Sequence, residues 1–252
     1  MKPASKKSWI LKQRPASVPN RDDVDIVEVD IPETLEGQVL IETTYFSLDP
    51  AIRGWMSDTP SYLPPIGLGD PIRASVTGVV VESKSPNLSV GDRVYGTGGW
   101  ETFCTGPAEY FSKIPDDVPF PDHYYLSIFG AVGLTPYFGL LSCGDIQPGQ
   151  TLLMSAAAGA VGSIGGQIAK IKGLRVVGLA GSEDKCNWVT DELGFDACIN
   201  YKTCGDLETA IRSACPEGVD VFFDNVGGET LDAALLNLNK DATVVFCGSI
   251  ST

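Results

Sequence analysis

A strand, a loop of very small residues, a helix and a second strand follow one another between residues 151 and 180, and this order constrains the chain most strongly. The apolar runs 151–155 and 174–180 are each long enough for one buried strand. Between them, apolar residues recur at helical spacing: Val161, Ile164, Ile168 and Ile171. This order predicts half of a dinucleotide-binding unit, in which the loop meets a phosphate.

The loop 156–162 contains only Ala, Gly and one Val, so a ligand can approach its backbone closely. A helix N-terminus attracts negative charge because its first N–H groups are free and its dipole is positive there. The usual fingerprint is Gly-x-Gly-x-x-Gly, and here it reads Ala157-x-Gly159-x-x-Gly162. We therefore predict a phosphate site at the start of this helix. The alternative is a tightly packed unit without a ligand.

The residues after the second strand indicate which dinucleotide binds. NAD-binding units place Asp or Glu about 20 residues past the fingerprint, on the ribose 2′-hydroxyl. This strand has no acid at its tip, and Glu183 and Asp184 are placed to cap the next helix. Ser182 and Lys185 can instead bind a 2′-phosphate, which favours NADP(H). The alternative is that Lys185 is a solvated helix residue.

Charge and cysteine content restrict the class of protein. The net charge of −14 over 252 residues argues against a nucleic acid as partner. No stretch approaches the ~20 apolar residues of a membrane helix, and the apolar run near the start is too short for a signal peptide. The seven cysteines are scattered without a C-x-x-C pair, which favours reduced thiols in a cytoplasmic protein.

The pattern of predicted secondary structure changes near residue 125, which predicts two domains. Residues 1–125 alternate short β-like runs with turn residues and indicate a barrel-like β domain. Residues 126–252 predict an α/β domain with a doubly wound parallel sheet of five strands. After the opening unit we expect helices at 184–193, 206–214 and 229–238, and strands at 197–201, 219–224 and 243–247. A full dinucleotide fold usually has about six strands, so we expect a truncated sheet; a natural five-stranded variant is the alternative.

Several collinear stretches resemble one enzyme family along essentially the whole chain. They are residues 47–56, 130–137, 156–162, 194–196, 200–202, 223–228 and 247–251. In these stretches the chain is similar to the prostaglandin reductase/leukotriene B4 12-hydroxydehydrogenase family of the medium-chain dehydrogenase/reductase superfamily. Bacterial and plant alkenal double-bond reductases belong to the same branch.

The resemblance implies a fold and a reaction. A GroES-like β-barrel domain over 1–125 would precede an NADP-binding Rossmann domain over 126–252. Family members continue for several dozen residues beyond the position that matches residue 252, and those residues form much of the surface of a homodimer. The implied reaction is the NADPH-dependent reduction of the C=C bond of an α,β-unsaturated ketone or aldehyde. Hydride goes to the β-carbon, and negative charge develops on the carbonyl oxygen, where preorganised donors lower the barrier.

The resemblance also implies roles for individual residues. Lys185 and Tyr201 match ligands of the 2′-phosphate, and Asn225 matches a residue that faces the nicotinamide half. The full set that matches cofactor ligands is Gly159, Ala160, Val161, Gly162, Lys185, Tyr201, Asn225, Cys247, Gly248, Ser249, Ile250 and Ser251. On the substrate side, Tyr62 matches a catalytic tyrosine and Trp100 an aromatic wall of the pocket. Their alternatives are a plain loop aromatic and ordinary packing. Ala51 departs from the tyrosine of many relatives, and Asp49-Pro50 is typical of a capped helix start.

Zinc alcohol dehydrogenases share this layout, but the chain lacks their ligands. The segments 47–49 (Ser-Leu-Asp) and 69–71 (Gly-Asp-Pro) stand where those enzymes have Cys and Gly-His-Glu, and His123 is the sole histidine. We therefore predict no metal. Three hypotheses follow: a zinc-independent NADPH enone or enal reductase, an NADPH-binding protein without turnover because of truncation, and an NADPH:quinone reductase.

Overall fold

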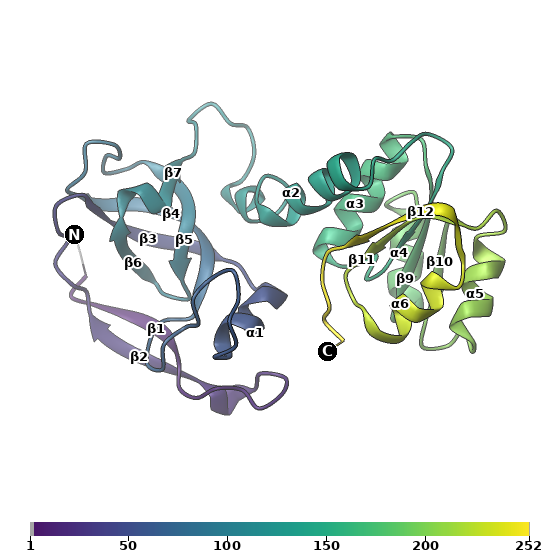
Figure 1. The fold of residues 1–252 in the computed structure, drawn as a ribbon. Helices are drawn as coiled ribbons and strands as arrows, with labels where there is room; N and C mark the ends of the chain where they lie inside the picture. Colours follow the sequence, from purple (N-terminus) through teal and green to yellow (C-terminus); the bar gives the residue numbers. More distant parts are fainter. Residues whose placement is uncertain (1–2, 252) are drawn as a thin grey trace. The chain divides into compact units, whose positions relative to one another are not determined.

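The computed structural model describes residues 3–251 and divides the chain into two compact units (Figure 1). The first unit extends to Leu126, and the second begins at Ser127. The first is built mainly from β-strands, whereas strands and helices alternate in the second. Among the described residues, no helix has the length and apolar character that a membrane crossing requires.

The first unit contains an antiparallel sheet of five strands in the order β6-β3-β4-β5-β7, and a separate antiparallel pair, β1 and β2. The prediction of a β domain is confirmed. The strands are β1 (Ser5–Leu11), β2 (Val24–Asp30), β3 (Gln38–Phe46), β4 (Arg73–Ser83), β5 (Arg93–Gly99), β6 (Phe103–Pro107) and β7 (Phe111–Lys113). Short helical segments connect them: η1 (Arg21–Asp23), α1 (Pro50–Met56), η2 (Ala108–Tyr110) and η3 (Asp122–Leu126).

The start of α1 only partly follows the prediction. Pro50 is the first residue of this helix, as expected from its fixed φ and missing N–H. Asp49 occupies the N-cap position, but its side chain makes no capping hydrogen bond. The Asp49 carbonyl instead accepts the backbone N–H of Ile52 at 3.0 Å, so backbone bonding rather than a side-chain cap begins the helix.

The second unit is a parallel sheet of five strands in the order β10-β9-β8-β11-β12, which confirms the predicted doubly wound arrangement. The strands are β8 (Thr151–Met154), β9 (Arg175–Ala180), β10 (Ala197–Asn200), β11 (Val219–Asp224) and β12 (Leu238–Phe246). The helices are α2 (Ala131–Phe138), the π-helical η4 (Gly139–Cys143), α3 (Ala160–Ile171), α4 (Glu183–Asp191), α5 (Leu207–Ala214) and α6 (Gly228–Leu235).

Successive residues of the central strand β8 face opposite sides of the sheet and enter two different cores. Leu152 and Met154 belong to the core covered by η4, α3 and α4. Leu153 belongs to the core covered by α5 and α6. Strands buried on both faces read as continuous apolar runs, which is why the run 151–155 indicated a strand without alternation.

The end of the second unit differs from the prediction. Helix α6 ends at Leu235 rather than at residue 238, and β12 begins at Leu238 rather than at 243. The pairing of β12 with β11 is interrupted by an irregularity, and Asp241 within it has a φ of 63°. The side chain of Asn239 donates to the carbonyl of Glu217 and to Asp220, which holds this irregular stretch against the start of β11.

Helix α3 forms where predicted, but the residues that it buries fully are not the apolar ones that indicated it. Its buried residues are all small: Gly162, Gly165, Gly166 and Ala169. Ile171, one of the apolar residues that indicated the helix, is 83% exposed. The ring of Phe195 lies directly on Gly166, where a Cβ would overlap it. Small residues on the inner face let the helix approach the sheet closely, while Val161 and Ile168 pack against the same core from partly buried positions.

We predict that Gly166→Ala lowers the free energy of unfolding by about 1–3 kcal/mol, because the added methyl group overpacks the Phe195 ring. Gly54→Ala is the matched control. Gly54 lies in α1 with no atom within 4 Å of an added Cβ, so alanine should stabilise the protein by about 0.5–1 kcal/mol. Urea denaturation of the three proteins measures both effects. Equal changes for the two variants would contradict the role given to this contact.

Candidate functional site

The predicted cofactor residues of the second unit follow the carboxyl ends of its parallel strands. The chain runs outward from β8 to β9 and β10, and then returns to the other side of β8 with β11 and β12. The order of the strands therefore reverses between β8 and β11. Ligands of open α/β sheets bind at this reversal, beyond the carboxyl ends of the strands.

The loop between β8 and α3 turns sharply through backbone contacts. Ala156 has a φ of 49°, a conformation that non-glycine residues seldom adopt. The carbonyl of Ala156 accepts the N–H of Gly159 at 2.8 Å. A Cβ at Gly162 would overlap that same carbonyl, so the first turn of α3 closes against the loop only because Gly162 has no side chain.

The N-terminus of α3 is suited to an anion. Its N-cap residue is Gly159, so no side chain caps the first free N–H groups, and its first turn contains no acidic residue. Free N–H groups and the positive end of the helix dipole favour a phosphate at this position. The predicted residues Gly159, Ala160, Val161 and Gly162 form this turn.

A buried carboxylate shapes the turn that carries Asn225. Asp224 is fully buried at the end of β11 and accepts the hydroxyl of Ser155 at 3.1 Å. It also accepts the N–H groups of Val226 at 2.9 Å and Gly227 at 3.0 Å. Asn225 in turn donates its backbone N–H to the Ser155 hydroxyl at 2.7 Å and its side-chain amide to the Ser155 carbonyl at 2.8 Å. The turn after β11 is thereby tied to the loop after β8.

The segment 247–251, which follows β12, lies along the same turn. Its first two N–H groups donate to the Asp224 carbonyl at 2.8 and 3.0 Å. The N–H and the hydroxyl of Ser251 both donate to the Val226 carbonyl, at 3.1 and 2.6 Å. Burial raises the pKa of the Cys247 thiol and the Asp224 carboxylate raises it further, which favours the neutral thiol. The structure thus brings the predicted residue Asn225 and the predicted segment 247–251 together, and joins their turn to Ser155 at the end of β8.

The ends of β9 and β10 also meet. If Gly181 carried a Cβ atom, the hydroxyl of Tyr201 would lie 2.7 Å from that atom, and the ε-carbon of Lys202 would lie 3.4 Å from it. Both side chains therefore cover the backbone just after β9, where only glycine leaves room. Lys185 lies exposed in the first turn of α4, which begins two residues later. This is the predicted 2′-phosphate region, and Lys202 is a cation that the sequence analysis missed.

Two neighbouring side chains have other partners than expected. The hydroxyl of Ser182 caps α4 by accepting the N–H of Lys185 at 3.4 Å. The carboxylate of Glu183, expected to cap this helix, instead accepts the Asn200 amide at 2.7 Å and the Thr203 hydroxyl at 3.2 Å. The N-cap of α4 is therefore Ser182, whereas Glu183 and Asp184 lie in the first turn, where acidic residues complement the helix dipole.

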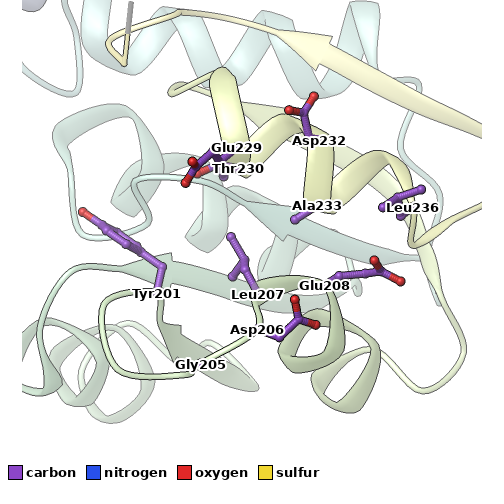
Figure 2. Close-up of a pocket in the computed structure, with 10 residues that line it drawn as sticks. All are labelled: Tyr201, Gly205, Asp206, Leu207, Glu208, Glu229, Thr230, Asp232, Ala233 and Leu236. Carbon is purple, nitrogen blue, oxygen red and sulfur yellow. The ribbon is translucent and has the colours of Figure 1, made fainter.

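Tyr201 also borders a pocket of about 410 Å³ between the starts of α5 and α6 (Figure 2). The pocket is lined by Tyr201, Gly205, Asp206, Leu207, Glu208, Glu229, Thr230, Asp232, Ala233 and Leu236. Figure 2 shows carboxylates around its mouth. Like charges repel, so this side of Tyr201 is unsuited to a phosphate, and the Gly181 side is the suitable one.

The two predicted substrate-side residues lie in the first unit. Tyr62 is 76% exposed, and its ring meets that of Trp55 edge-on at 6.0 Å. Trp100 is half-buried, donates its indole N–H to the Ser47 carbonyl at 2.9 Å and packs near Phe46. Trp100 therefore has a structural role of its own, whereas Tyr62 is accessible to a ligand.

Metal ligands do not gather in the described part of the chain. Within residues 3–251, no three His, Cys, Asp or Glu side chains are grouped so as to hold a metal ion. The side chain of His123 instead packs near Tyr45 and Tyr124.

Comparison with known proteins places the chain among oxidoreductases. Residues 7–114 match a family described as the N-terminal domain of oxidoreductase, and residues 160–252 match one described as zinc-binding dehydrogenase. The chain is 45% identical to a putative NADP-dependent oxidoreductase, YfmJ, from Bacillus subtilis, over 99% of this chain and 73% of the relative. It is 41% identical to the NADPH-dependent curcumin reductase of Escherichia coli, over 97% and 70%. It is 40% identical to prostaglandin reductase 1 of Bos taurus, over 97% and 73%.

A solved structure shows the same fold. The crystal structure of CurA from Vibrio vulnificus matches with a TM-score of 0.92 at 38% sequence identity, over 98% of this chain and 72% of CurA. CurA in complex with NADPH matches with a TM-score of 0.89, over 94% and 70%.

We predict that Asp224→Ala lowers the free energy of unfolding by at least about 1–3 kcal/mol, because the donors of Ser155, Val226 and Gly227 lose their buried acceptor. Asp232→Ala is the control, since Asp232 is exposed, and its effect should stay within about 0.5 kcal/mol. Chemical denaturation measures both. A loss for Asp224→Ala no larger than that of the control would show that the carboxylate does not organise the turn.

Proposed function

We propose that this chain, which belongs to the medium-chain dehydrogenase/reductase superfamily and is an NADPH-dependent oxidoreductase, reduces the C=C bond of α,β-unsaturated ketones and aldehydes. The observation that carries the proposal is the joined edge of the second unit. There Ser155, the Asn225 turn and the segment 247–251 are joined by hydrogen bonds, and the chain leads from Ser155 into the uncapped start of α3. Such an edge accommodates an extended dinucleotide.

The residues present fit NADPH. Gly159 to Gly162 would hold the pyrophosphate at the helix N-terminus, where a side chain at Gly162 would overlap the Ala156 carbonyl and prevent the turn from closing. Lys185 and Tyr201, at the ends of β9 and β10, would hold the 2′-phosphate. Asn225 and the segment 247–251 would face the nicotinamide half. When bound, NADPH supplies the hydride that reaches the β-carbon of the substrate.

The substrate class rests on the relatives and on an accessible tyrosine. Prostaglandin reductase 1 and curcumin reductase are among the relatives that match nearly the whole chain. Reduction of an enone places negative charge on the carbonyl oxygen, and a hydroxyl donor stabilises that charge. The exposed Tyr62 residue carries the hydroxyl that we propose as the donor to the substrate. Trp100 would contribute to the wall of the substrate pocket.

We propose that the reaction needs no zinc. The donor set supports this, because the described residues contain no group of three metal-ligating side chains. All seven cysteines are free thiols, which supports a reducing cytoplasmic location.

The decisive experiment follows the absorbance of NADPH with the purified chain. We expect oxidation of NADPH with a 2-alkenal, at a higher kcat/KM than with a quinone, and without added metal. A preference for the quinone would indicate a quinone reductase. Measurable NADPH binding without oxidation by either substrate would indicate a binding protein without turnover, and an equivalent of zinc in the pure protein would contradict the zinc-independent mechanism.

We predict that Lys185→Ala raises the Kd for NADPH by about 10–100-fold, because a charge-assisted hydrogen bond to the 2′-phosphate is lost. The Kd for NADH, which lacks this phosphate, should change by less than about twofold. Lys172→Ala is the matched control, since Lys172 is also an exposed lysine and lies at the C-terminal end of α3, away from its N-terminal turn. Fluorescence titration with both cofactors measures the constants. Equal weakening of NADPH and NADH binding would refute the assignment of Lys185.

A further inference from the structure

The loop that carries Tyr62 is closed at its base by one arginine. We call residues 57–65, between the end of α1 and Ile66, the Tyr62 loop. A single nitrogen of Arg14, Nη1, donates to the carbonyl of Met56 at 2.8 Å and to the carbonyl of Ile66 at 2.6 Å. These carbonyls stand immediately before and immediately after the loop. Arg14 itself comes from the segment after β1, more than forty residues earlier.

Backbone bonding and aromatic packing complete the enclosure. The N–H of Ile66 donates to the Trp55 carbonyl at 2.8 Å, which joins the two ends of the loop directly. Arg73 donates to the carbonyl of Pro64 at 2.9 Å, and its guanidinium lies 5.9 Å from the centre of the Trp55 ring. The Tyr62 ring meets the same Trp55 ring edge-on. The position of Tyr62 therefore depends on the Trp55 ring, which packs near Arg73, and on the loop ends that Arg14 joins.

The chemistry of this base requires a cation with several donors. Met56 and Ile66 are 3% and 2% exposed, so their carbonyls lie in a poorly hydrated environment and need a donor. The guanidinium of Arg14 is always charged, and its planar group presents donors in fixed directions. A side chain without a donor would leave the carbonyls of Met56 and Ile66 without this partner.

We propose that Arg14 is a positioning residue, which holds the Tyr62 loop in the conformation that presents Tyr62 to the substrate. This inference rests on the proposed function, because it takes Tyr62 as the residue that contacts the enone oxygen. Arg14 does not touch substrate or cofactor in this account. It acts through the loop, so its loss should change substrate handling and leave the cofactor site in the second unit unchanged.

The test combines loop mobility with kinetics in Arg14→Ala and Arg14→Lys. Chymotrypsin can cut after Tyr62, and limited digestion should cut there about tenfold faster or more in Arg14→Ala, because cleavage follows the population of the open loop. The kcat/KM for a 2-alkenal should fall by about 10–100-fold, the effect of a misplaced catalytic group. Arg14→Lys keeps a charged donor but lacks the fixed planar geometry of the guanidinium, so it should lie between Arg14→Ala and the native protein in both measurements.

Arg21→Ala is the control, because Arg21 is an exposed arginine in η1 of the same unit, and it should match the native protein in both assays. The Kd for NADPH should be the same in all these proteins. In a Tyr62→Ala background, Arg14→Lys should reduce kcat/KM no further, because the two changes remove the same interaction.

Unchanged cleavage at Tyr62 in both Arg14 variants would overturn the proposal, and so would losses in kcat/KM that add to that of Tyr62→Ala. A loss of NADPH affinity together with activity would point to general unfolding and would overturn it as well. Failure of the proposed function is distinguishable, since it appears in the native protein as an absence of alkenal reduction, before any variant is compared.

Discussion

The closeness of helix α3 to the sheet is the constraint on which the site of the second unit depends. Glycines on the inner face of the helix bring its axis toward β8 and β9, and the ring of Phe195 fills the space that larger residues would occupy. The same absence of a side chain at Gly162 lets the first turn close over the Ala156 carbonyl. The packing of the helix and the shape of the turn that we propose to bind a phosphate therefore have one common cause.

Asp224 supplies the second organising element, because it connects strand ends that are far apart in the sequence. Its side chain orders the turn after β11, and its carbonyl receives the segment that follows β12. A buried carboxylate is costly unless all its acceptor positions are used, and here hydroxyl and backbone donors surround it. The nicotinamide side of an NADPH site would thus be built from backbone held by one carboxylate.

Local patterns predicted the strands and most helices of the second unit, because strands buried on both faces read as continuous apolar runs and helices buried on one face read as periodic ones. They failed where a partner distant in the sequence decides. The apolar spacing of α3 included Ile171, which is exposed, whereas the ring of Phe195 packs on Gly166. The irregular start of β12 depends on Asn239 and its partners near β11. The bonds of Arg14 and of Ser155 join residues whose types carry no local signal of their pairing.

The enclosure of the Tyr62 loop has a consequence for how such enzymes diversify. A loop whose ends are joined by Arg14 and by the bond between Ile66 and Trp55 makes few demands on the identity of the residues at its tip. The entropy of closing a loop grows slowly with length, so insertions there are tolerated thermodynamically. Natural variation, or a library built at residues 58–61 that retains Tyr62, can therefore explore new substrate shapes while the scaffold beneath stays the same.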